Sequence, residues 1–80
     1  METQTIKLLA FGMLAEHLGF MQQDFSLPAD TDSFLSKLKG QFPILADLKF
    51  SIAVNRKMVT SNTLLNAGDE VALLPPFSGG

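Results

Sequence analysis

The chain has 80 residues, a formal net charge of −2 and no cysteine. This length suits one small domain, and 46% apolar against 18% charged residues is a globular rather than a disordered composition. The slight acidity argues against nucleic acid as a partner, because phosphate binding needs a basic face. The absence of cysteine excludes disulfides, thiolate nucleophiles and cysteine metal sites. It suits a reducing cytosol, so we expect a cytoplasmic protein.

No apolar run approaches the roughly 20 residues that cross a bilayer, and the first five residues are polar. We therefore expect neither a signal peptide nor a membrane anchor. We also expect no metal site, because Asp24, Asp30, Asp32 and Asp47 lack the spacing of metal ligands. The apolar share is high for so small a domain, so part of the apolar surface is expected to form a partner interface.

The first half of the chain alternates between strand and helix patterns. Residues 5–11 alternate with period two, which predicts a strand with one apolar face made of Ile6, Leu8 and Ala10. A short helix is expected over residues 13–18, ended by Gly19. Residues 21–27 predict a second strand, which stops at Pro28.

The second half begins with a helix capped by Asp30 or Thr31 and weakened near its end by Gly40. A further helical turn is expected before the chain becomes extended again. We then expect a strand over residues 51–54, a tight turn over 55–57 and a return strand over 58–60. A second turn is expected over residues 67–69 and the last strand over 70–74. This order predicts one α+β domain, a mixed sheet with helices packed on one face.

The chain stops on Pro75-Pro76-Phe77-Ser78-Gly79-Gly80. Proline ends a strand and starts an extended segment, so we expect a domain over residues 1–76 and a flexible, protruding tail over 77–80. At full extension the tail reaches on the order of 13–14 Å. Glycines without Cβ atoms can enter a narrow channel, and their α-carboxylate needs activation before it accepts a nucleophile. The alternative is a frayed terminus without a function.

Three apolar residues are predicted to face outward and to bind a partner: Phe11, Met58 and Leu74. The alternative, most open for Met58, is that a loop or helix covers them. Phe77 is expected to dock in a partner's groove, although it can also fold back onto the sheet. His17 is expected to be solvated rather than catalytic, and Asp69-Glu70 either meets a basic partner or is solvated.

Residues 66–80 resemble the C-terminal signature of the molybdopterin synthase small subunits, which are ubiquitin-like sulfur carriers of the ThiS/MoaD superfamily. Weaker likeness covers residues 6–12, 16–19 and 53–55. The resemblance implies a β-grasp fold. It also implies that Gly80 bears the reactive group, that Gly79 threads into the partner's site, and that the preceding residues contact the partner: Pro75, Pro76, Phe77 and Ser78.

The resemblance further implies a cycle with three protein partners. An E1-like adenylyltransferase uses ATP to adenylate Gly80, and sulfur from a cysteine desulfurase converts the carboxylate to a thiocarboxylate. The tail then enters the large synthase subunit, within a heterotetramer, and donates sulfur to cyclic pyranopterin monophosphate in molybdenum cofactor biosynthesis. The chain would be no enzyme on its own and would hold no permanent cofactor.

Three alternatives stay open at this point. The chain can be a sulfur carrier for thiazole synthesis or tRNA thiolation, a modifier joined to lysines of other proteins, or a β-grasp adaptor with an incidental tail. All of them predict the same fold, so the fold cannot choose among them.

Overall fold

The structure is a computed structural model of the chain and describes residues 4–76. Its elements, in chain order, are β1 (Thr5–Ala10), α1 (Met13–Leu18), β2 (Gln22–Ser26), α2 (Thr31–Gln41), the 3-10 helix η1 (Pro43–Asp47), β3 (Ser51–Val54), β4 (Lys57–Val59) and β5 (Glu70–Leu74). This is the predicted order, and η1 is the further turn expected after the second helix.

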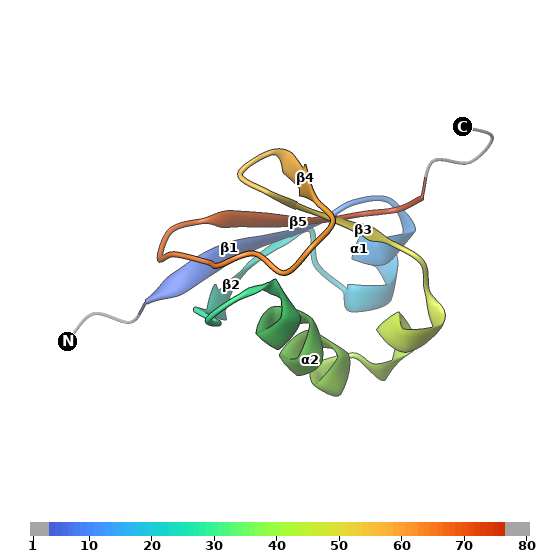
Figure 1. Cartoon of the computed structure of the whole chain (residues 1–80). Coiled ribbons are helices and arrows are strands. Elements are labelled where there is room, and N and C mark those ends of the chain that lie inside the picture. The colour runs from blue at the N-terminus through green and yellow to red at the C-terminus, as the bar shows by residue number, and fades with distance from the viewer. Residues whose placement is uncertain (1–3, 77–80) are drawn as a thin grey trace.

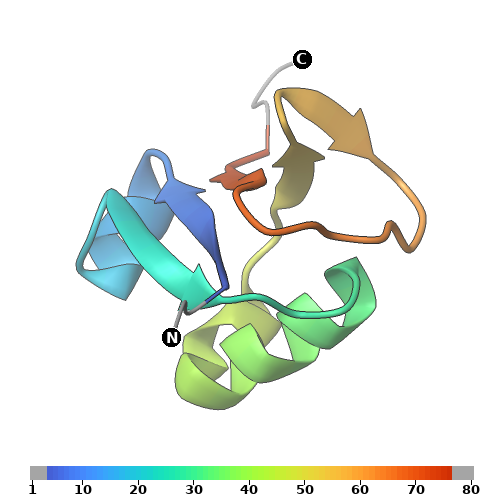
Figure 2. The same ribbon diagram turned by 90° about the vertical axis from the view of Figure 1, so that its left-hand side faces the viewer.

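The five strands form one mixed sheet in the order β2-β1-β5-β3-β4. Strands β1 and β5 are parallel, and the other neighbours are antiparallel. The helices lie on one face of this sheet, below it in Figure 1, and the opposite face carries no helix (Figures 1 and 2). Because the last strand is also the central one, the chain leaves the middle of the sheet at Pro75.

The core lies between the sheet and the helices. The predicted inner face of β1 is confirmed, since Ile6, Leu8 and Ala10 are each 1% exposed. They pack with the inner face of β5 and with the apolar sides of the two α-helices; the fully buried members include Val71, Leu73, Leu14, Phe34 and Leu38. Burial of apolar surface at roughly 25 cal/mol per Å² makes this layer the main source of stability.

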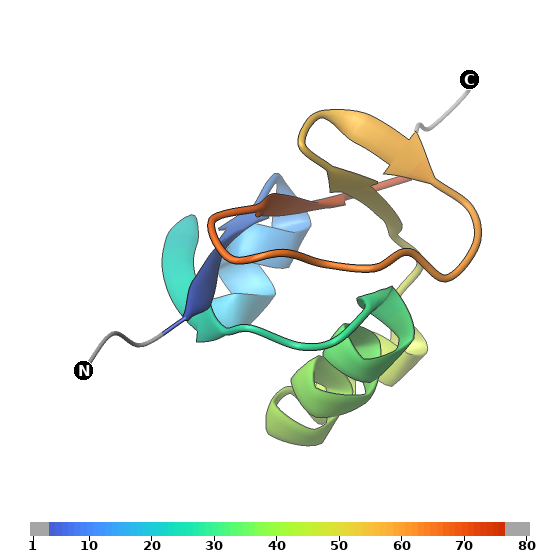
Figure 3. The same ribbon diagram turned by 60° about the vertical axis from the view of Figure 1, so that its left-hand side comes forward.

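Helix α2 begins at a cap that also anchors a distant loop. The Asp30 side chain accepts a hydrogen bond from the Ser33 N–H at 2.9 Å, which identifies Asp30 as the cap. This bond and a second one from Asn62 lower the pKa of the Asp30 carboxyl, because both favour its charged form. The β4–β5 connection, drawn in orange in Figure 3, passes between the β3–β4 hairpin and α2 and is held at this cap.

The β3–β4 turn is shorter than predicted. Lys57 was expected in the turn, but it pairs with Val54, and the turn consists of Asn55 and Arg56 alone. Both have positive φ, 51° and 71°, as the two-residue turns that match strand twist require. Asparagine adopts this conformation readily and arginine does not, so the sequence pattern misplaced the start of β4 by one residue.

Smaller differences from the predictions concern the ends of elements. The first strand ends at Ala10, one residue before Phe11, and β2 begins at Gln22 rather than Met21. Helix α2 continues through Gly40 to its last residue, Gln41. The adjacent Leu64 and Leu65 differ in environment, because Leu65 is buried whereas Leu64 is 76% exposed.

Candidate functional site

The helix-free side of the sheet carries a continuous apolar row. Across neighbouring strands, Leu9 pairs with Ala72, Ala72 with Ala53, and Ala53 with Met58. Since side chains alternate along a strand, these residues point away from the core that their neighbours fill. We call this surface the open face and define it by six residues: Leu9, Phe11, Ala53, Met58, Ala72 and Leu74.

The open face combines small and large side chains. At its centre Ala53 and Ala72 are only 5% and 8% exposed, so its accessible apolar surface lies at the margins, where Met58 is 52% and Phe11 44% exposed. Neither a helix nor a loop covers Met58 to the extent that the alternative interpretation required. Such a surface supports non-directional docking, and the flexible thioether of Met58 can adapt to differently shaped partners.

The base of the tail lies at one end of the open face. The Phe11 N–H donates to the Leu73 carbonyl at 3.2 Å, and Leu74 is the register partner of Ser51. Pro75 is half-buried and Pro76 is exposed. The open face is therefore continuous from Met58 on the edge strand to the point where the tail leaves the sheet.

Gly12, which lies between the predicted first strand and the first helix, contributes to the tail base. Its φ is +58°, and a Cβ atom there would lie 3.2 Å from Cγ of Pro75. Only glycine combines this backbone conformation with so close an approach. Gly12 thus lets the first proline of the tail pack against the β1–α1 turn.

A shallow hollow adjoins this end of the open face. It has a volume of ≈ 450 Å³ and is lined mainly by apolar side chains, including Phe11, Phe20 and Met21. Met21 is 72% exposed and Met13 is 39% exposed nearby in the chain. The predictions did not include Phe20 and Met21, because no periodic pattern connects them to the outward residues of the strands.

The remaining predicted residues divide into two groups. Phe77, Ser78, Gly79 and Gly80 lie outside the described residues, so their roles stay predictions. His17 is exposed at the end of α1, as expected. Asp69 has a structural role that was not predicted: it accepts hydrogen bonds from the Asn55 side chain at 3.0 Å and from the Asn66 N–H at 2.8 Å.

Over residues 4–76, no three histidine, aspartate or glutamate side chains are grouped closely enough to hold a metal ion. Among the helices of the same residues, none is long and apolar enough to cross a membrane.

A comparison with protein families gives one match, to the ThiS family model, over residues 9–80. The chain belongs to the ThiS family. It is 35% identical over 81 residues to the molybdopterin synthase sulfur carrier subunit of Chlamydomonas reinhardtii, covering 94% of this chain and 98% of that one. The protein of the same name from Arabidopsis thaliana is 30% identical over 79 residues, covering 94% and 82%. The resemblance drawn from the tail is thereby confirmed.

Solved structures confirm the fold of this ThiS-family protein. It superposes on the solution structure of small archaeal modifier protein 1 from Methanosarcina acetivorans with a TM-score of 0.82, at 24% identity over 100% of both chains. The complex of subunits 1 and 2 of the molybdopterin-converting factor from Helicobacter pylori gives a TM-score of 0.72, at 24% identity over 95% and 99%. The fold is the expected ubiquitin-like β-grasp.

Proposed function

We propose that this ThiS-family protein is the sulfur carrier subunit of a molybdopterin synthase. The observation that carries the proposal is a sequence match to sulfur carrier subunits of that name, which spans almost the whole chain. The open face supports it, since an exposed apolar surface that leads to the tail base suits reversible docking on more than one partner.

The first step activates the α-carboxylate of Gly80. At neutral pH this carboxylate is an anion and a poor electrophile. Attack of one of its oxygens on the α-phosphorus of ATP breaks the bond to the β-phosphate, releases pyrophosphate and forms an acyl adenylate. An E1-like adenylyltransferase supplies this step, and the carrier supplies only the terminal group.

The second step exchanges oxygen for sulfur. A persulfide sulfur, delivered from a cysteine desulfurase, attacks the acyl carbon and AMP leaves with the oxygen. A thiol then reduces the resulting acyl disulfide, so that the thiocarboxylate is freed and a disulfide forms on the thiol side. The chain has no cysteine of its own. Sulfur therefore travels on the main-chain terminus rather than on a side chain.

The body of the carrier presents this terminus. Phe11, Met58 and Leu74 dock on the partner, and Pro75 and Pro76 direct the tail away from the sheet. Phe77 and Ser78 contact the partner, and Gly79 threads a channel that side chains would block. In the large synthase subunit, the thiocarboxylate then gives its sulfur to cyclic pyranopterin monophosphate.

The test begins with the intact mass of the protein after incubation with the activating enzyme, ATP and a sulfur source. The expected product has one carboxylate oxygen replaced by sulfur. The variant without Gly79 and Gly80 should keep the fold and give no such product. Absence of the thiocarboxylate from the full chain under these conditions would remove the carrier function.

A second stage separates the alternatives. Thiocarboxylated protein is added to the large subunit with cyclic pyranopterin monophosphate, and molybdopterin is measured. In parallel reactions the same protein is offered to thiazole-forming and tRNA-thiolating systems, and lysine adducts are sought by mass spectrometry. Sulfur transfer in one of these parallel reactions, without molybdopterin formation, would reassign the carrier to that pathway.

A further inference from the structure

A groove opens on the helix side of the sheet where the β3–β4 ladder ends. Ile52 and Val59 are the last paired residues of the hairpin. Beyond them, residues 48–51 lead back to η1 and residues 60–62 turn toward α2, so the two segments diverge. The space between them, floored by α2, is a groove with a volume of ≈ 600 Å³. We call it the α2 groove; Met58 at its margin also belongs to the open face, and the proposed sulfur chemistry does not use its other lining residues.

Hydrogen bonds hold one wall of the α2 groove in place. The Asn62 side chain accepts from the Thr31 hydroxyl at 3.2 Å and from the Asp32 N–H at 2.9 Å, and it donates to the Asp30 carboxylate at 3.1 Å. These bonds attach residues 60–62 to the start of α2 and keep them apart from residues 48–51. The groove is therefore preformed, which lowers the entropic cost of binding.

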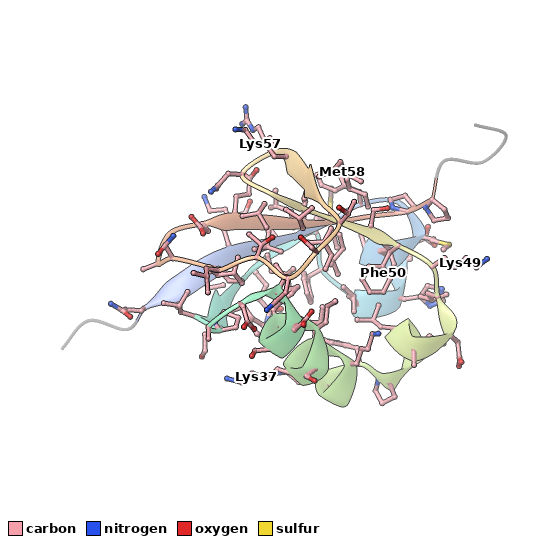
Figure 4. The ribbon with its side chains drawn as sticks, in the orientation of Figure 1. Lys37, Lys49, Phe50, Lys57 and Met58 are labelled. Atoms are coloured by element: carbon pink, nitrogen blue, oxygen red, sulfur yellow. The ribbon has the colours of Figure 1, made fainter. Side chains whose placement is uncertain are left out.

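The interior of the α2 groove is apolar. Its lining includes Leu35, Leu48, Phe50, Ile52 and Val59. Only Ile52 is fully buried, and the other four are half-buried, so they leave apolar surface open to solvent. Figure 4 shows Phe50 on the helix side of the sheet, near the diverging segments. Two or more apolar side chains of a ligand could be buried here in place of water.

The rim of the α2 groove is basic. Lys39 of α2 and Lys49 of the η1–β3 connection line it, against one acidic residue, Asp32. The surrounding residues 33–57 contain five lysines and arginines and a single aspartate, a net charge of +4 within a chain of −2. Lys39 and Lys49 are far apart in the sequence, but in the fold both lie beside the apolar lining of the groove. An acidic ligand is favoured there.

We propose that the α2 groove binds an extended segment of a partner protein in which apolar and acidic side chains alternate. The apolar side chains fill the groove, and the carboxylates meet Lys39 and Lys49. Ser51, which lines the groove, is also the register partner of Leu74. A partner held in the groove would therefore lie near the base of the tail, but largely on the other side of the sheet from the open face.

Three labelled octapeptides test the chemistry of the proposed ligand. One alternates valine with glutamate, the second serine with glutamate, and the third valine with lysine. We expect the valine–glutamate peptide to bind and to shift the backbone-amide NMR signals of residues 48–52 and 58–62. The other two should bind at least about tenfold more weakly, the equivalent of about 1.4 kcal/mol. Equal binding of the serine–glutamate peptide, signal changes confined to the Phe11 side, or no saturation by the first peptide would each overturn the proposal.

Charge-reversal variants test the location. Lys39→Glu combined with Lys49→Glu should weaken the valine–glutamate peptide about tenfold, because two attractions become repulsions. Lys37→Glu is the matched control, since Lys37 is exposed on the same helix without lining the groove, and Figure 4 shows Lys37 and Lys49 extending from opposite sides of the molecule. An equal loss in the control variant would contradict a specific site. Sedimentation of the free protein as a dimer that the peptide disperses would assign the α2 groove to a second copy of the chain instead.

Discussion

The two faces of one sheet serve different purposes in this molecule, although both are apolar. On the helix side, Val71 and Leu73 of β5 are completely buried. On the other side, the same strand presents Ala72 and Leu74, and no helix packs on them. Apolar residues thus stabilise the fold on one face, whereas on the other Phe11 and Met58 stay exposed.

This difference explains why so small a domain can be rich in apolar residues. The folded state has already gained the burial energy of the helix-side face, so changes there should act on stability. The open face gains its burial energy only when a partner arrives, so changes there should act on binding. The two effects can be measured separately.

The largest expected effect is on the helix side. Phe34 is completely buried and contacts Phe25 edge-to-face with ring centroids 5.3 Å apart. Phe34→Ala should lower the free energy of unfolding by about 3–5 kcal/mol, which approaches the total stability of a domain of this size. Urea denaturation followed by circular dichroism measures the loss. A loss below about 1 kcal/mol would contradict the assignment of Phe34 to the core.

The matching change on the open face should leave stability nearly unaltered. Met58→Asp is expected to change the free energy of unfolding by less than about 1 kcal/mol and to weaken the complex with the activating enzyme by about 10- to 100-fold. Isothermal titration calorimetry measures the affinity. The control is Leu64→Asp, which places the same charge at a more exposed leucine outside the open face. Equal weakening by both variants would argue against a defined docking surface.

Two glycines give a smaller and opposite pair of effects. Gly12→Ala should destabilise the fold by about 1–2 kcal/mol, because φ is positive there and the new Cβ would press on Pro75. Gly40→Ala, within α2 and with no atom within 4 Å of its Cβ position, should stabilise by about 0.5–1 kcal/mol. Thermal unfolding of both variants checks the signs. If both substitutions changed the stability in the same direction, the close approach of Gly12 to Pro75 would not contribute to stability.

The smallest expected effect concerns pH. The pKa of Asp30 is lowered in the folded protein by hydrogen bonds to its carboxylate, foremost from the Ser33 N–H. Its ionised form therefore stabilises the fold above the unfolded pKa of about 3.9, and this contribution is lost as the pH falls through the lower folded pKa. Asp30→Asn keeps a good capping residue but cannot titrate. The difference in urea midpoint between the wild type and this variant should shrink in acid, and a difference independent of pH would contradict the account.

The sequence pattern predicted the element order well because each strand and helix carries its own periodicity. Ile6, Leu8 and Ala10 identify a buried face from their spacing alone. For Met58 the pattern left both interpretations open, and its 52% exposure in the structure decides for the outward one. Element ends were less predictable, because Arg56 adopts a positive φ that its residue type disfavours and that the neighbouring strands impose.

Features built from distant segments could not be predicted in this way. Nothing in the sequence distinguishes Asn62 from other polar loop residues. Its side chain nevertheless holds the β4–β5 loop at the start of α2, 30 residues away. The α2 groove likewise depends on where residues 48–51 and 60–62 diverge, which no local pattern encodes. In the sequence Gly12 only separates the first strand from the first helix, and its approach to Pro75 gives it a role at the tail base.

The central position of β5 has a mechanical consequence for the proposed function, in which the last residues are drawn into another molecule. Four register pairs connect β5 to β1, and four connect it to β3. Tension applied to the tail acts along the strand axis, so it loads the hydrogen bonds of both ladders in shear, together rather than one after another. A partner can therefore pull on the carboxyl end with considerable force before the domain yields, and the same strand that holds the sheet together acts as the anchor of the tail.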